Sequence, residues 1–133
     1  MICEKAGMMI FDTDIFIWVQ RGSEKAASLM EGVEERYLSV QTYMELLQCA
    51  KNKTQHRCIK DFLTTFDFHI LPLTENIGHR ASIYIEEYGL SSGIRAGDAI
   101  VAATAVENNR PLASSNAKHF RSIKELKLKT FKP

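Results

Sequence analysis

Short apolar segments alternate along this chain with longer segments of helical periodicity, and this alternation restricts the fold more than any other feature. Strands are expected at residues 8–11, 36–40, 68–73 and 111–115, with a possible fifth, edge strand at 126–131. Because the short segments are apolar on both faces, helices must cover both faces of the sheet. The pattern therefore predicts an α/β fold, a three-layer α/β/α sandwich around a short, mostly parallel central sheet.

Helices are expected between these strands. Apolar residues spaced three and four apart predict a helix over residues 23–36, with Ser23 as its N-cap. The other expected helices cover residues 41–53, 55–66, 74–88 (ended by Gly89) and 98–109, and a short turn or helix covers 116–120. The chain therefore reads as one continuous α/β unit with no linker.

Length and composition are those of a single domain. The 133 residues, 45% apolar and 25% charged, suffice for one core, so we expect one domain over residues 1–133, with 1–7 as an N-terminal extension. No signal peptide is recognised, and the apolar runs are far shorter than the roughly 20 residues that span a bilayer. These features predict a cytoplasmic protein without a membrane partner. The three cysteines, Cys3, Cys49 and Cys58, form no C-x-x-C pair and suggest neither a disulfide framework nor a zinc site.

Charge is distributed unevenly. Residues 110–133 carry seven Lys and Arg against the single acid Glu125, although the whole chain has a net charge of only +1. One interpretation is a solvated basic end without a partner. The other is a surface that binds a polyanion beside an acidic site, as a nuclease would hold a phosphate backbone.

The segment MMIFDTDIF, residues 8–16, places two carboxylates inside the most apolar part of the chain. An acid in such surroundings is costly unless it is hydrogen-bonded, paired or bound to a metal. Asp12 follows the first strand, and ligands of open parallel sheets bind at the carboxyl ends of the strands. Asp12 is therefore a candidate site residue, although it could instead cap the next helix. Asp14 could face the same site or solvate the first helical turn.

Three further polar residues are candidate site residues. Periodicity alone places Glu45 on the solvent side of its helix, opposite the apolar stripe. Asp98 opens a strongly apolar helix, where capping and catalysis are compatible roles, and Asn116 follows the fourth strand. Carboxylates that converge repel one another unless they are protonated or bridged by a cation, and oxygen ligands select Mg²⁺ or Mn²⁺.

Three motifs carry a family resemblance. MIFDTDIFIW, LSVQTYMELLQCA and GDAIVAATAVENNRPLASSNAKHF resemble, in order and spacing, the motifs of PIN-domain ribonucleases, and in particular VapC-type toxins of bacterial and archaeal type II toxin–antitoxin systems. The resemblance extends from about Met8 to Phe131. It implies an α/β/α sandwich and a metal-dependent endoribonuclease, a hydrolase in which metal-activated water cleaves the phosphodiester bond of RNA.

The resemblance also implies roles for individual residues. Asp12, Glu45 and Asp98 match the family's catalytic acids and would bind Mg²⁺ or Mn²⁺. Asn116 stands where the family often has a fourth acid, and this departure puts a full four-acid site in doubt. Thr13 and Asp14 match secondary positions, and Thr13 would hydrogen-bond a carboxylate or a metal water. Lys118 and Arg121 would position the RNA backbone. The implied partners are RNA, a cognate antitoxin and a second copy of the chain in a homodimer.

Two other interpretations remain open. The D-x-D of MMIFDTDIF also matches the opening of haloacid-dehalogenase-like phosphatases, in which Asp12 would accept a phosphoryl group, although no later Lys and acid pair is found in the required context. Alternatively, Asn116 has disabled the metal site, and the chain is a catalytically degenerate module that binds nucleic acid or protein.

Overall fold

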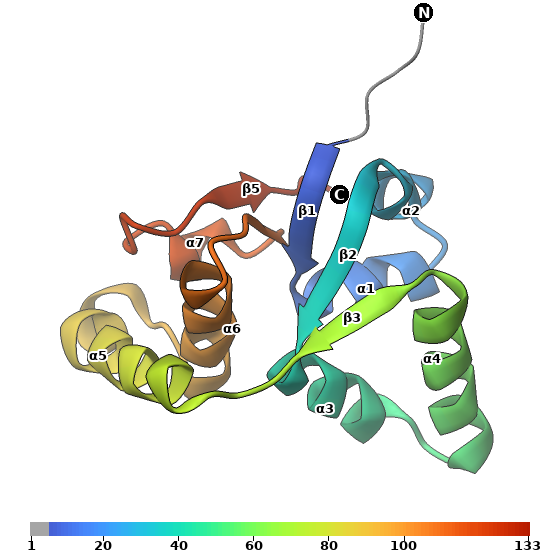
Figure 1. The fold of residues 1–133 in the computed structure, drawn as a ribbon, viewed down its shortest axis with the longest axis horizontal. Coiled ribbons are helices and arrows are strands. Elements are labelled where there is room, and N and C mark those ends of the chain that lie inside the picture. Colours follow the sequence, from blue (N-terminus) through green and yellow to red (C-terminus); the bar gives the residue numbers. More distant parts are fainter. Residues whose placement is uncertain (1–5) are drawn as a thin grey trace, which may run out of the picture.

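The computed structural model describes residues 6–133 (Figure 1). The elements follow in the order β1 (Ala6–Phe11), α1 (Thr13–Gln20), α2 (Glu24–Glu31), β2 (Val33–Ser39), α3 (Val40–Cys49), α4 (Lys53–Thr65), β3 (Phe68–Leu71), α5 (Glu75–Ser92), α6 (Ala96–Glu107), β4 (Leu112–Ser114), α7 (Ala117–Phe120) and β5 (Leu128–Thr130). The five predicted strands are all present, and the fifth is an edge strand as expected.

The sheet is parallel throughout and has the strand order β3-β2-β1-β4-β5. The chain first adds strands on one side of β1 and then crosses to its other side to form β4. The carboxyl ends of β1 and β4 therefore meet where the direction of winding reverses, which is where ligands of open parallel sheets bind. Asp12 follows β1 at this point, and Ser115 and Asn116 follow β4.

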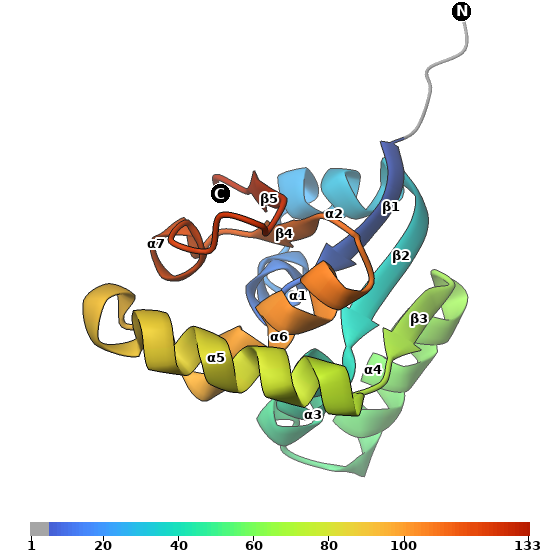
Figure 2. The ribbon, with the colours of Figure 1, turned by 60° about the vertical axis from the view of Figure 1, so that its left-hand side comes forward.

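Helices cover both faces of this sheet (Figure 2). Alternate residues of β1 point to opposite faces, as the strand period of two requires. Ile10 belongs to the core under α5 and α6, and Phe11 belongs to the core under α1 to α4. Both side chains are fully buried. The predicted α/β/α sandwich is confirmed, with a sheet that is parallel rather than mostly parallel.

Several predicted boundaries are wrong. The helix expected over residues 23–36 ends at Glu31, because Gly32 caps it and β2 begins at Val33. Residues 33–35 belong to the expected helix, but Val33 and Glu35 pair with β1. Helix α5 continues through Gly89 to Ser92 and ends at Gly93, whose φ of +72° favours glycine. Helix α6 begins at Ala96, so Asp98 is its third residue rather than its first.

The chain termini and cysteines complete the comparison with the sequence. Strand β1 begins at Ala6, so the last two residues of the expected N-terminal extension lie in the sheet, and residues 1–5 lie outside the described part. Cys49 and Cys58 are free and exposed on helices, and Cys3 is not described. Within residues 6–133 no helix is long and apolar enough to cross a membrane.

Candidate active site at the carboxyl edge of the sheet

Asp12 lies at the centre of the polar cluster that follows β1 and β4. It is the N-cap of α1, and its Oδ1 accepts a hydrogen bond from the Thr13 backbone N–H at 2.8 Å. Its Oδ2 accepts a hydrogen bond from the Ser114 hydroxyl, also at 2.8 Å. Only 7% of the residue is exposed. Asp12 therefore caps a helix and is also buried at the edge where ligands bind, so the two interpretations of this residue are compatible.

The surroundings of Asp12 disfavour its charged form. Burial raises the pKa of its carboxyl from 3.8 to about 7, and the negative charge of Asp14 adds to this effect. The hydrogen bonds from Ser114 and Thr13 act in the opposite direction, and the charge of Asp98 contributes a smaller increase. A carboxyl group that is partly protonated near neutral pH has not found a counter-charge among the side chains around it.

Asp14 joins Asp12 through the segment that follows β4. Its Oδ2 accepts hydrogen bonds from the Ser115 backbone N–H at 2.7 Å and from the Ser115 hydroxyl. The Ser114 hydroxyl, which donates to Asp12, lies 3.5 Å from the same oxygen. The second oxygen, Oδ1, is buried and has no hydrogen-bond partner among the described residues. A buried carboxylate oxygen without a partner is costly, and a cation or water would satisfy it.

Glu45 is held by a chain of hydroxyl groups. The Thr13 hydroxyl lies 3.1 Å from Glu45 Oε1 and 3.1 Å from the Thr42 hydroxyl, which in turn lies 3.3 Å from the Ser39 hydroxyl. Since a carboxylate only accepts, Thr13 donates to Glu45 and accepts from Thr42. Glu45 is half-buried, so the orientation inferred from periodicity is wrong in part: the Glu45 side chain contacts Thr13, whereas Met44 and Gln48 on the same side of α3 are exposed.

Asp98 belongs to a second cluster formed by α6 and α7. Its Oδ2 accepts a hydrogen bond from the Arg95 backbone N–H at 3.3 Å and lies 2.9 Å from His119 Nδ1. The Asn116 amide nitrogen is 2.8 Å from the same ring nitrogen. Because one nitrogen cannot donate and accept at once, His119 satisfies either Asp98 or Asn116 in a given tautomer.

His119 was not among the residues inferred from the sequence. The four histidines share no metal-ligand spacing, and this criterion alone hides His119. The available signal is its position three residues after Asn116, which in a helical turn places the two side chains together. Lys118 and Arg121 are exposed on and beside the same short helix.

The residues inferred from the sequence thus gather around the ends of β1 and β4, but they do not form a ready-made metal cage. Within residues 6–133 no three His, Cys, Asp or Glu side chains converge closely enough to hold an ion. Glu45 and Asp98 are instead engaged by Thr13 and His119. The donors are nevertheless carboxylate oxygens, one of which is an orphaned Asp14 atom, and Asp12 lacks a counter-charge. This donor set fits a hard divalent cation.

The fold is similar to those of known proteins. The model of the PIN domain family matches residues 9–126. A toxin–antitoxin complex from Klebsiella pneumoniae contains a chain with 28% identity and a TM-score of 0.78, and the match covers 92% of this chain and 96% of that one. VapBC2 from Rickettsia felis, bound to a DNA fragment from its promoter, matches at 20% identity and a TM-score of 0.76, over 94% and 99% of the two chains.

FitAcB from Neisseria gonorrhoeae matches at 22% identity and a TM-score of 0.70, over 91% of this chain and 96% of that one. A search among curated proteins found no match. The family match begins within β1, ends in the segment after α7 and includes the three motifs that carry the family resemblance, which argues against the phosphatase interpretation. The chain belongs to the PIN domain family, and its structural neighbours are the toxins of VapBC-type toxin–antitoxin complexes.

Proposed function

We propose that the protein is a metal-dependent endoribonuclease that acts as the toxin of a toxin–antitoxin pair. The observation that carries this proposal is the pair of Asp12 and Asp14 at the end of the central strand. Asp12 is buried with a pKa of about 7, and Asp14 has a buried oxygen without a partner among the described residues. Such a pair is costly in a structural role and suited to binding a cation, and PIN domains are typically nucleases.

Asp12, Glu45 and Asp98 would hold one or two Mg²⁺ or Mn²⁺ ions, with Asp14 as an additional oxygen donor. A divalent ion there would lower the pKa of water and stabilise charge that develops on the phosphate. The chain's own contribution is to position these acids. Thr13 orients Glu45 through its hydroxyl.

His119 would orient Asp98 in the tautomer in which its Nδ1–H donates to that carboxylate. Asn116, a neutral group where the family often has a fourth acid, contacts the same ring nitrogen of His119 rather than a carboxylate. Lys118 and Arg121 extend from this side of the site into solvent, where their charges would attract the RNA backbone and give binding a salt dependence.

A degenerate binding module is the second candidate, because no three potential ligands converge within the described residues. RNA cleavage distinguishes the two. The purified chain, freed of any partner, is incubated with total cellular RNA in Mg²⁺, Mn²⁺ or EDTA, beside Asp98→Asn. Asparagine keeps an oxygen for the Arg95 N–H but removes the charge. Asp61→Asn, an exposed change on α4, is the matched control.

We expect fragments with the wild type and Asp61→Asn in Mg²⁺ or Mn²⁺, and none with Asp98→Asn or in EDTA. A folded wild type that cleaves nothing with either metal would support the binding module. Cleavage that persists in EDTA would contradict the metal-dependent mechanism.

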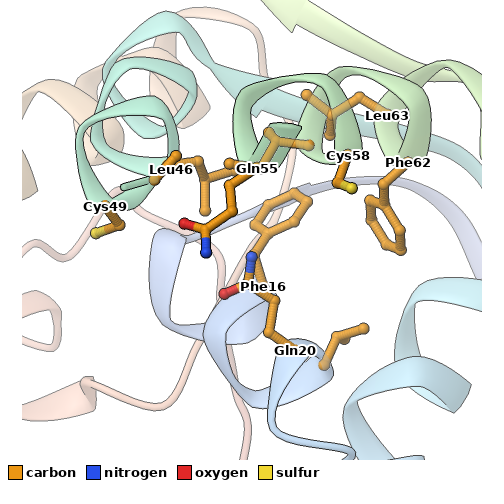
Figure 3. Close-up of a pocket in the computed structure, with 11 residues that line it drawn as sticks. Phe16, Gln20, Leu46, Cys49, Gln55, Cys58, Phe62 and Leu63 are labelled. Carbon is orange, nitrogen blue, oxygen red and sulfur yellow. The ribbon is translucent and has the colours of Figure 1, made fainter. Parts of the chain in front are cut away.

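The partner is proposed to be an antitoxin, because the similar chain from Klebsiella pneumoniae comes from a toxin–antitoxin complex. An apolar groove of about 540 Å³ lies between α1, α3 and α4 (Figure 3). Phe16, Leu46 and Phe62 line it, and the thiols of Cys49 and Cys58 lie along it. An apolar segment of the antitoxin would fill this groove.

Thiol labelling tests this placement. We expect a candidate antitoxin, co-expressed and co-purified with the chain, to protect Cys49 and Cys58 from a maleimide. Cys58→Glu should weaken the complex, and Cys58→Ser should not. Unchanged labelling in a stable complex would place the antitoxin elsewhere. The expected homodimer stays a prediction, to be checked by light scattering of the purified chain.

A further inference from the structure

A second hollow lies beside the acidic cluster, on the polar face of α3. Its volume is about 600 Å³, and it is lined by Gln41, Met44, Glu45, Leu47, Gln48 and His56. Four of these residues follow the spacing i, i+3, i+4 and i+7 and therefore share one face of the helix. This face lies opposite the stripe that packs into the core, so the hollow opens to solvent.

The hollow is joined to the proposed catalytic residues at two points. Glu45 lines it and is also hydrogen-bonded to Thr13. One turn earlier, the Gln41 amide lies against the start of α6, where a Cβ added to Gly97 would come within 3.2 Å of Gln41 Nε2. Gly97 precedes Asp98. The hollow therefore lies on the helix that carries Glu45, and its Gln41 end lies next to the helix that carries Asp98.

The lining of the hollow selects a class of ligand. Apart from Glu45 it contains no carboxylate, Lys or Arg among the described residues, so it lacks the cations that would hold a phosphate. Two primary amides offer donors and acceptors to the edge of a base. Met44, 47% exposed, and the His56 ring offer surfaces for stacking. His56 Nε2 lies 2.9 Å from the Leu47 carbonyl oxygen, which fixes the ring against α3.

We propose that this hollow binds an unpaired nucleobase of the RNA substrate, from a nucleotide adjacent to the phosphate that is cleaved. The inference rests on the proposed ribonuclease function and extends it to the choice of cleavage site. Gln41 and Gln48 read the base edge, and Met44 and His56 contact its face. A phosphate at the acids and a base in the hollow would belong to neighbouring positions, because Glu45 borders both.

Binding to RNA that is not cleaved tests the proposal. Asp98→Asn protein in Mg²⁺ is titrated with a labelled single-stranded RNA that the wild type cleaves once, and with versions in which each nucleotide near that site is abasic in turn. We expect one abasic position to weaken binding about tenfold, as the loss of one stacked base does. Gln48→Ala, added to Asp98→Asn, should weaken binding of the intact RNA. In this double variant the abasic substitution at that position should cause almost no further loss of affinity.

Asn76→Ala in the same background is the matched control, because Asn76 is an exposed amide on α5 and does not line this hollow; this variant should bind like the parent. Circular dichroism confirms that each variant is folded. Equal losses at the abasic position with and without Gln48→Ala would overturn the inference while leaving the ribonuclease function intact. If the wild type neither cleaves nor binds any RNA, the proposed ribonuclease function fails, and this inference fails with it.

Discussion

Phe11 and Asp12 are consecutive residues at the end of the same central strand, and both are almost inaccessible to water, with 0% and 7% exposure. Phe11 packs edge-on against Phe68, with ring centroids 5.9 Å apart, inside the core under α1 to α4. Asp12 meets two hydrogen-bond donors and two other negative charges. The first residue stabilises the fold, whereas the second destabilises it whenever it is ionised. The sheet therefore holds a costly group in place because the residues beside it pack well.

The largest effect on stability is expected from a substitution of Phe11, the residue of this pair that stabilises the fold. Phe11→Ala should lower the free energy of unfolding by about 3–5 kcal/mol, because it removes a fully buried ring and leaves a cavity. Urea denaturation followed by circular dichroism measures it. Phe66→Ala, at a residue that is 38% exposed, is the control and should cost much less. Equal losses in the two variants would show that burial at the end of β1 is not what stabilises the sheet.

Ionisation of Asp12 should make the stability of the protein depend on pH. The pKa of Asp12 is 3.8 in the unfolded chain and about 7 in the folded protein, so the folded state holds its proton more tightly between these values. The free energy of unfolding should therefore fall as pH rises from about 4 to about 7. The asparagine of the Asp12→Asn variant cannot ionise. The free energy of unfolding of this variant at pH 8 should therefore be about 2–4 kcal/mol higher than that of the wild type, since each tenfold difference in proton affinity between the folded and unfolded states corresponds to roughly 1.4 kcal/mol.

Urea titrations in EDTA across pH 4 to 8, with Asp61→Asn as control, measure this difference. If the Asp12→Asn and wild-type curves remain parallel over this range, the pKa of Asp12 is not raised and the central observation of the proposed function is lost.

Ser114→Ala should have a smaller effect. The Ser114 hydroxyl donates to Asp12 Oδ2, and its loss leaves that oxygen buried without a partner, which costs about 1–3 kcal/mol. The loss should be greater at pH 8 than at pH 5, because the hydrogen bond favours the ionised form of Asp12. Ser82→Ala, on the exposed surface of α5, is the control. A loss of the same size at both pH values would mean that Ser114 acts through packing.

Glu45→Gln should change stability least, by within about 0.5 kcal/mol, because Glu45 is only half-buried and glutamine can still accept from Thr13. Its effect should appear in metal binding. Calorimetric titration with Mn²⁺ should give a several-fold lower affinity than in the wild type, whereas the exposed change Glu86→Gln leaves the affinity unchanged. Equal Mn²⁺ affinity in all three proteins would exclude Glu45 as a ligand.

The parts of the fold that the sequence predicts are those set by interactions between residues close together in the chain. Ser23 and Thr74 accept hydrogen bonds at the starts of α2 and α5, as their types predict. The strand β2 begins three residues before the predicted start, because Val33 fits the helical spacing and Glu34 and Glu35 have low strand preference. Only pairing with β1 places these residues in a strand.

The site divides in the same way. Asp12 was identifiable because an acid that follows an apolar strand must lie where the carboxyl ends of the parallel strands meet. Glu45 was not, because helical periodicity gives the angle of a side chain around its own helix and not what that angle faces. Its role was inferred from the family resemblance, and the structure adds the Thr13 contact.

The sequence by itself therefore determined the alternation of strands and helices and the position of the first acid, because these depend on neighbours within a few residues. It also predicted a parallel sheet, because strands that are apolar on both faces must be covered by helices on both sides. Only the tertiary structure decided that β4 lies beside β1, which places Ser114 against Asp12 from 102 positions away. The same is true of the contacts of His119 with Asp98 and of Thr13 with Glu45. Such contacts depend on the packing of the whole chain, because no local pattern specifies which distant residue will fill the space beside a buried charge.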